Sequence, residues 1–383
     1  MNTKNILLTG GRAPVTLHLA RMLNNKGHNV YVAESEAIHL CQKSNVVKGN
    51  FLVPKPNENQ QNYVDKLIQL CKENSIGLLI PTCEEIFHIA KLRELFTVNN
   101  IHVFCTTIDI LRLLHNKFTF NQYLNDNNYI SPKTIKVSTR EELDKGLKHF
   151  NNQKIVLKKV FSRFASDVYI LNSSDILPSI TISEKEPWII QEFINGTQYC
   201  SYSVAQNGKL NAHTCYPTIY TAGLGANVYF QHVEVPSIQL FVERIVKELN
   251  FTGQIAFDFI KDDKGNYYPI ECNPRSTSGL HLFDDTDDFS NLFFQSIEEL
   301  LKPNGEWTYK LGIPMFLYGF SNRFLSRNFL RDFLMAKDVI YSTKDKIPYF
   351  YQGKIFLHLL SRKIKSRKKL SELTTEDIEW SGN

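Results

Sequence analysis

The chain has 383 residues, of which 43% are hydrophobic and 22% are charged, and its formal net charge is +5. This composition is typical of a globular protein of two or three domains and excludes a disordered chain. No apolar run approaches the roughly 18 residues that span a bilayer, and the N-terminus lacks a signal-peptide pattern. The seven cysteines are scattered without a CxxC pair, which favours reduced thiols over a zinc site or disulfides. We therefore expect a cytoplasmic protein.

The first 105 residues alternate short apolar strand patterns with helical patterns, which is typical of a doubly wound α/β domain with a parallel sheet. Gly10-Gly11 begins a loop that lacks the third glycine of a dinucleotide-binding GxGxxG motif, although Glu34 stands where its ribose-binding acid would be expected. A Rossmann oxidoreductase is therefore the less favoured interpretation. Strands are predicted at 5–11, 29–35, 76–85 and 101–107, and helices are predicted at 15–28 and 84–95.

From residue 106 hairpins are mixed with helices, which indicates an α+β region. The hairpins are predicted to turn at Asn207-Gly208 and within residues 263–266. An aromatic-rich tail follows Pro303, and its segment 361–370 carries six Lys or Arg. A solvated helix face is the favoured interpretation of this segment, with contact to nucleic acid or an anionic membrane as the alternative. Helices are predicted at 107–129 and 237–250, and strands at 154–160, 166–171, 187–194, 198–206 and 209–217 and on both arms of a hairpin at 253–275.

The second hairpin carries polar side chains where a sheet normally carries apolar ones. Residues two apart in a strand share one face, so Glu271, Asn273 and Arg275 project into the same space. The predicted turn brings Asp258 almost opposite Glu271, and cross-strand neighbours lie roughly 5 Å apart. Two carboxylates that close repel each other unless a proton or a cation lies between them. Together with the amide oxygen of Asn273, the two acids predict a Mg²⁺ site.

The stretch GQIAFDFIKDDKGNYYPIECNPRSTSGLHLF, residues 253–283, resembles the signature of the ATP-grasp superfamily, and most nearly its carbamoyl-phosphate-synthase-like branch. The resemblance implies an α/β N-terminal pre-ATP-grasp, Rossmann-like domain at residues 1–105. It also implies an α+β ATP-grasp fold of two subdomains at 106–300, with a mobile lid subdomain at about 120–187. Residues 301–383 are expected to form a C-terminal extension that completes the acceptor pocket.

By this resemblance, two lysines and a hinge segment bind the nucleotide. Lys117 and Lys158 match the lysines that contact the phosphates. The loop after Lys158, VFSRFASD, departs from the family pattern because it has no glycine, and Arg163 and Ser166 are candidates to replace its backbone contacts. The hinge matches IIQEFINGTQY, in which backbone groups bind adenine and one side chain reaches the ribose. The residues at these positions are Glu192, Phe193 and Ile194 for adenine and Gln198 for the ribose.

The resemblance further implies Asp258, Glu271 and Asn273 as metal ligands and Arg275 as the catalytic arginine that faces the transferred phosphate. The implied activity is an ATP-dependent ligase that forms carbon–nitrogen bonds. It activates a carboxylate as an acyl phosphate and joins it to an amine, with release of ADP and phosphate. ATP and two Mg²⁺ are the expected cofactors, with Mn²⁺ as an alternative ion, and the expected partners are a small-molecule carboxylate and amine. No nucleic acid or membrane partner is expected, and a homodimer is left open. The alternatives are a non-catalytic ATP-binding protein and an ATP-grasp kinase-like phosphotransferase.

Overall fold

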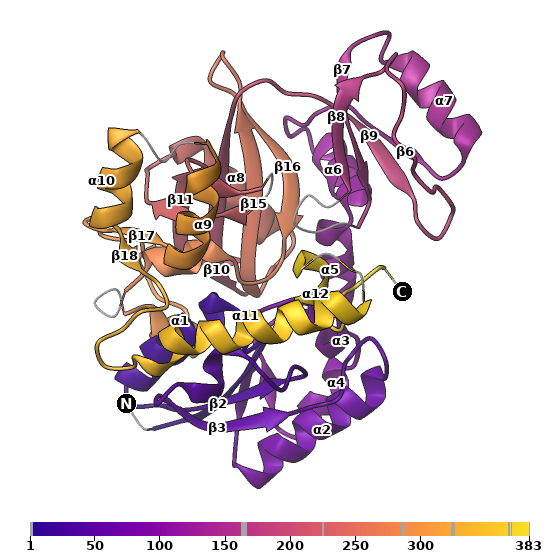
Figure 1. The fold of residues 1–383 in the computed structure, drawn as a ribbon. Helices are drawn as coiled ribbons and strands as arrows, with labels where there is room; N and C mark the ends of the chain where they lie inside the picture. The colour runs from indigo at the N-terminus through magenta and orange to yellow at the C-terminus, as the bar shows by residue number, and fades with distance from the viewer. Residues whose placement is uncertain are drawn as a thin grey trace.

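Three large sheets follow one another along the chain in the computed structural model (Figure 1). The structure describes residues 3–161, 167–223, 226–284, 288–322, 326–366, 368 and 370–382. The lid-loop candidates Arg163 and Ser166 lie outside these ranges. Within them, no helix combines the length and the apolar character that crossing a bilayer requires.

The first sheet is entirely parallel, with strand order β3-β2-β1-β4-β5, which confirms the predicted parallel sheet near the N-terminus. Its strands are β1 (Asn5–Thr9), β2 (Asn29–Glu34), β3 (Val47–Leu52), β4 (Leu78–Ile80) and β5 (His102–Val103). The sequence did not predict β3, because its stretch VKGNFL interrupts the apolar pattern with Lys48, Gly49 and Asn50. The accompanying helices are α1 (Pro14–Asn25), α2 (Gln60–Glu73), α3 (Glu85–Lys91), α4 (Arg93–Thr97) and the short 3₁₀ helix η1 (Leu40–Lys43).

The helix predicted at 84–95 is two helices, because Leu92 leaves the helical conformation at φ −114°, ψ 25°. This break lets α4 turn back toward β5. Two further helices, α5 (Ile108–His115) and α6 (Lys117–Asp126), lead from this region to the second sheet. Asn116 separates them with an extended backbone, and its side chain accepts from the N–H groups of Phe118 and Thr119, so that it caps α6.

The second sheet is antiparallel, with order β6-β9-β7-β8. Helix α7 (Arg140–His149) covers one face of it, where Leu143 and Leu147 join a core with Trp188. Figure 1 shows this layer standing apart from the rest of the molecule at the upper right. Its strands are β6 (Thr134–Val137), β7 (Lys154–Lys159), β8 (Val168–Asn172) and β9 (Trp188–Glu192).

The third sheet is antiparallel, with order β11-β10-β15-β16, and packs against α8 (Pro236–Glu248). Both predicted hairpins are confirmed. Asn207 and Gly208 have φ of 49° and 74°, the positive values that a type I′ turn requires, and Gly265 turns the second hairpin at φ 86°. The strands are β10 (Thr197–Gln206), β11 (Lys209–Pro217), β15 (Gly253–Lys261) and β16 (Tyr267–Asn273).

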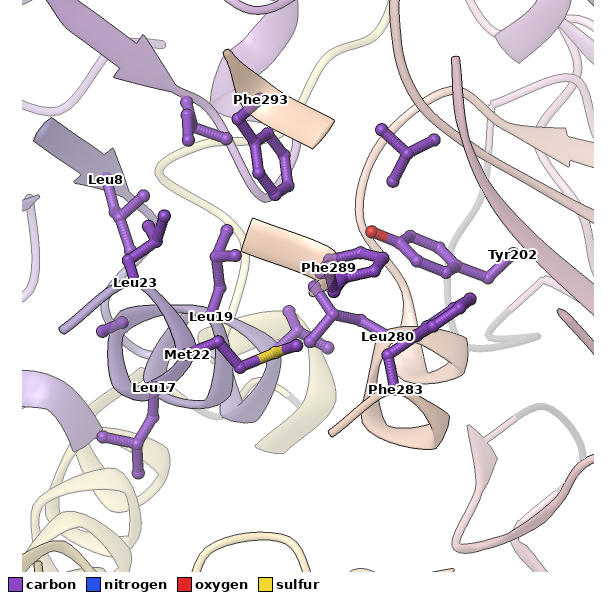
Figure 2. Packing of buried hydrophobic residues seen from close by; sticks show 14 of the residues in the cluster. Leu8, Leu17, Leu19, Met22, Leu23, Tyr202, Leu280, Phe283, Phe289 and Phe293 are labelled. Carbon is purple, nitrogen blue, oxygen red and sulfur yellow. The ribbon is translucent and has the colours of Figure 1, made fainter. Parts of the chain in front are cut away.

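One hydrophobic core connects the first sheet to the third. Leu19 and Met22 of α1 point toward Leu280 and Phe289, which follow β16 in the chain (Figure 2). Tyr202 of β10 joins the same cluster from the third sheet. The segment after Arg275 is therefore held against the N-terminal helix. It contains the short 3₁₀ helices η2 (Ser278–Leu282) and η3 (Phe289–Phe293).

The C-terminal part of the chain packs back against segments from the N-terminal part. Helix α11 (Ile347–Ser366) lies across the front in Figure 1, and the segment beyond it contacts the loop after β1 and helix α3. There Asp377 is ion-paired with Arg12 at 2.6 Å, and Trp380 stacks on Phe87. The remaining elements are β12 (Thr221–Ala222), β13 (Ala226–Asn227), β14 (Tyr229–Gln231), β17 (Thr308–Lys310), β18 (Lys337–Asp338), α9 (Gly312–Asn322), α10 (Arg327–Met335) and α12 (Leu370–Leu373).

Candidate active site

The hairpin of β15 and β16 brings the predicted acids together. Asp258 pairs directly with Glu271, and Ala256 pairs with Asn273. The neighbouring Cys272 points the other way, into the core under the sheet, as strand alternation requires. The oxygens of Asp258, Glu271 and Asn273 therefore share one half-buried face.

The two carboxylates raise the energy of each other's charged form. Burial, followed by the nearby charge of Glu271, raises the pKa of Asp258 to about 6, although Arg275 and Lys158 oppose the shift. A divalent cation between the carboxylates would offset both effects, and carboxylate and amide oxygens are the ligands that Mg²⁺ prefers. The donor set thus fits the ion. Among the described residues no cluster of three or more His, Cys, Asp or Glu could hold a metal, so any ion here needs Asn273 or non-protein ligands.

Two lysines from different elements converge on β16. Lys117, the first residue of α6, is buried, and its Nζ lies 3.4 Å from Oε1 of Glu271. Lys158 of β7 is also buried, and its Nζ donates to the carbonyl of Ile270 at 3.2 Å. Burial lowers the pKa of Lys158 to about 8, against the attraction of Glu271. A buried ammonium is unfavourable unless an anion neutralises it, so this pair of cations is suited to a polyanion.

The adjacent Lys159 faces elsewhere. Its Nζ lies 3.9 Å from Asp167 and 3.6 Å from Glu186, on the partly exposed side of β7. Successive residues of a strand point to opposite faces, so only Lys158 can share the space in front of β16.

Arg275 follows β16 and reaches toward the first sheet. Its guanidinium donates to the side-chain oxygen of Asn273 at 3.2 Å and to the carbonyl of Ser276 at 3.1 Å. It also lies 3.8 Å from Oε1 of Glu84. Its Nε and the hydroxyl of Thr277 are buried and have no hydrogen-bond partner among the described residues. Arg275 therefore keeps an unused donor beside the metal-ligand candidates.

Glu84 was not predicted as a site residue. It is buried beside the start of α3, where its Oε2 lies 3.9 Å from Nε2 of His115. Burial, and then the charges of Lys117 and Arg275, hold the pKa of His115 well below its usual range, so the imidazole is neutral. The available signal was the pair of acids Glu84 and Glu85, where the loop that follows the buried parallel strand β4 meets α3, because ligands of α/β sheets gather at the carboxyl ends of strands.

The predicted hinge joins the second sheet to the third. The N–H of Glu192 donates to the carbonyl of Lys133 at 2.8 Å, and the N–H of Phe193 donates to that of Lys154 at 3.3 Å. Among the described residues the N–H of Ile194 has no backbone partner. Of the three predicted adenine contacts, Ile194 is thus the one whose N–H remains available.

Gln198 lies in β10, beyond the hinge. It pairs with Ile260 of β15, and its backbone carbonyl accepts from the N–H of Thr218 at 2.9 Å. Its side chain is half-buried, so it remains accessible at the junction of the two sheets.

The loop beside Glu34, where a dinucleotide-binding protein would hold the ribose, is occupied by the protein's own side chains. The Glu34 carboxylate accepts from the backbone N–H of Arg12 at 2.9 Å and from the Arg12 guanidinium, which also binds Asp377. The position that would hold a ribose is therefore filled by the protein's own ion pairs, which argues against a dinucleotide there.

The family model described as the ATP-grasp domain matches residues 114–279, a range that includes all ten predicted site residues. No curated protein sequence matches the chain.

Solved structures with the same fold cover most of the chain. N5-Carboxyaminoimidazole synthetase from Staphylococcus aureus has 13% identity and a TM-score of 0.63, over 85% of this chain and 89% of that one. The biotin carboxylase domain of 2-oxoglutarate carboxylase from Hydrogenobacter thermophilus, in complex with MgADP, ADP and bicarbonate, has 12% identity and a TM-score of 0.58, over 79% and 72%. L-Amino acid ligase from Bacillus licheniformis has 13% identity and a TM-score of 0.58, over 78% and 76%. At these identities the likeness establishes the fold.

Proposed function

The chain carries an ATP-grasp domain, as its sequence resemblance indicates, and from this premise we propose that it is an ATP-dependent carboxylate–amine ligase. It would transfer the γ-phosphate of ATP to a small-molecule carboxylate and join the resulting acyl phosphate to an amine, releasing ADP and phosphate. This proposal rests mainly on one observation: two buried lysines and Arg275 converge on the hairpin that carries the paired acids. Solved structures of the same fold include a MgADP complex and an L-amino acid ligase, which supports this reaction class.

In this proposal Asp258, Glu271 and Asn273 hold Mg²⁺, two ions by the sequence resemblance, with Mn²⁺ as a substitute. The metal, when bound, neutralises phosphate charge during transfer. Lys117 and Lys158 would bind the phosphates. Because Lys117 begins α6 and Lys158 lies in β7, the nucleotide would be held between two different elements. A polyanion beside Lys158 would restore the pKa that burial has lowered, so that the lysine is fully charged when ATP is present.

Arg275 would bind the transferred phosphoryl group and the carboxylate oxygen that accepts it. An arginine can donate two parallel hydrogen bonds to such oxygens, whereas a lysine presents a point charge. The same Nη2 of Arg275 lies beside the side-chain oxygen of Asn273 and Oε1 of Glu84, and the two contacts together would orient the guanidinium. Glu84 thus acts as a positioning residue in this proposal.

Adenine would bind at the hinge through Glu192, Phe193 and Ile194, with the Ile194 N–H as donor, and Gln198 would contact the ribose. We assign residues 1–105 to a Rossmann-like pre-ATP-grasp domain and 106–300 to an ATP-grasp domain of two subdomains. The lid subdomain is proposed at about 120–187, and β9 (Trp188–Glu192), which pairs with both β6 and β7, would complete its sheet. Closure of the lid would keep water from the acyl phosphate.

Residues 301–383 are proposed to complete the acceptor pocket, and a homodimer is the proposed assembly. A cytoplasmic location is supported by the seven cysteines, all of which are free thiols, six of them buried.

The test is ATP-dependent phosphate release measured with panels of carboxylic acids and amines, with the product identified by mass spectrometry. A ligase gives ADP, phosphate and an amide only when both substrates are present. A stable phosphorylated product without an amine would identify a kinase-like phosphotransferase instead. ATP binding with no turnover for any pair in the panels would identify a non-catalytic ATP-binding protein.

A further inference from the structure

The outer side of α11 exposes large apolar side chains. Phe350 is 71% exposed, Leu357 is 67% exposed and Ile364 is 81% exposed. These residues are seven positions apart, which places them on the same side of a helix. A soluble protein normally buries such a stripe or covers it with a partner.

The opposite side of α11 fixes the helix to the molecule. The hydroxyl of Tyr351 donates to Oε1 of Gln42 at 2.6 Å, and Ile355 packs against the core that connects the first and third sheets. Arg362 is ion-paired with Glu36 and, at 2.7 Å, with Glu376. The helix cannot rotate its apolar stripe inward without breaking these contacts.

Every charged side chain of α11 is cationic. Residues 347–366 contain Lys354, Arg362, Lys363 and Lys365 and neither Asp nor Glu. The three lysines are exposed. On a helical projection Lys354 and Lys365 border the apolar stripe on one side, whereas Lys363 lies about 120° from the centre of the stripe. Lysine at the borders of an apolar stripe is typical of helices that lie in the interface of an anionic membrane.

We propose that α11 docks the protein on an anionic membrane surface, with its apolar stripe among the acyl chains and its lysines at the phosphate level. A second copy of α11 would place cation against cation. Nucleic acid would neutralise the lysines but would leave Phe350, Leu357 and Ile364 in water. This contact replaces the sequence-based expectation that there is no membrane partner, and it does not depend on the proposed ligase activity.

The experiment is flotation of the full chain with phosphatidylcholine vesicles and with vesicles that also contain phosphatidylglycerol. The protein should float with the anionic vesicles, and high salt should weaken the binding. Leu357→Glu should reduce the vesicle affinity by at least about tenfold, because it removes a leucine that would lie among the acyl chains and adds a negative charge that the anionic lipid repels. Leu240→Glu is the matched control, since Leu240 is 63% exposed on a different helix, α8. It should float like the wild type, and both variants should keep the wild-type Tm.

Other outcomes overturn the proposal. Equal flotation with neutral and anionic vesicles would overturn the preference for an anionic surface, and equal losses in the two glutamate variants would remove the role of α11. A wild-type dimer that Leu357→Glu dissociates, together with no flotation, would identify a second copy as the occupant. Salt-sensitive binding to a DNA duplex without flotation would identify nucleic acid.

Discussion

Replacing Lys158 by methionine should stabilise the fold while it weakens ATP binding. Burial lowers the Lys158 pKa from 10.5 to about 8, and this difference corresponds to about 3 kcal/mol of unfavourable free energy when the lysine is charged. Methionine fills a similar volume without charge but leaves the carbonyl of Ile270 without its donor, which costs about 1 kcal/mol. The free energy of unfolding at neutral pH should therefore rise by about 2 kcal/mol.

The sign of the pH dependence follows from the same pKa. Below about pH 8 the folded protein carries the charged, buried lysine at its full cost. As the pH rises from about 8 toward 10.5, the folded state loses the proton while the unfolded state keeps it, so the cost disappears. The advantage of Lys158→Met should thus be present near neutral pH and vanish in alkaline buffer.

Denaturant titrations at about pH 7 and about pH 10 would measure this change, and ATP titrations would show the loss of affinity. Lys159→Met is the matched control, because Lys159 is partly exposed and paired with Asp167 and Glu186. It should leave ATP affinity unchanged and should not raise stability. A less stable Lys158→Met protein with normal ATP affinity would refute the reasoning, because the lysine would then be structural.

Substitutions at three further positions test the rest of the site. Glu271→Ala should abolish ATP turnover while the folded protein persists, and near-normal phosphate release would remove the metal assignment. Arg275→Ala should lower kcat by about 10²–10³ with little change in ATP affinity, and Arg275→Lys should recover only part of that loss; full recovery by lysine, with a large fall in Tm for Arg275→Ala, would indicate a structural anchor. Mn²⁺ binding, followed by electron paramagnetic resonance, should weaken about tenfold for each pH unit below about 6, since Asp258 must be ionised to bind the ion. Asp258→Asn should bind Mn²⁺ weakly and without this pH dependence.

The sequence alone determined the features that depend on neighbours in the chain. Asn207-Gly208 and the turn at Gly265 specify two hairpins because both need positive φ. Once the second hairpin is placed, strand alternation puts Glu271, Asn273 and Arg275 on one face and counting from the turn sets Asp258 opposite Glu271. The alternation of strands and helices likewise predicted the parallel sheet.

Only the tertiary structure decided which distant groups meet at that face. Lys117 and Lys158 lie 41 positions apart in the sequence, yet packing of α6 and β7 brings both ammonium groups to β16. Glu84 reaches Arg275 from the first sheet because one core joins α1 to the segment after Arg275. Such contacts depend on how whole layers pack, and no local pattern encodes them.

In the C-terminal part, too, the sequence shows the composition of a helix, and the packing of the fold decides which side of the helix faces solvent. The sequence shows that 361–370 is basic, but whether α11 hides or presents Phe350 and Leu357 depends on which side of it binds the body of the protein. Tyr351 and Arg362 settle that orientation through Gln42 and residues near both ends of the chain. Helical periodicity groups side chains onto faces, and only the packing of the fold decides which face is left to solvent.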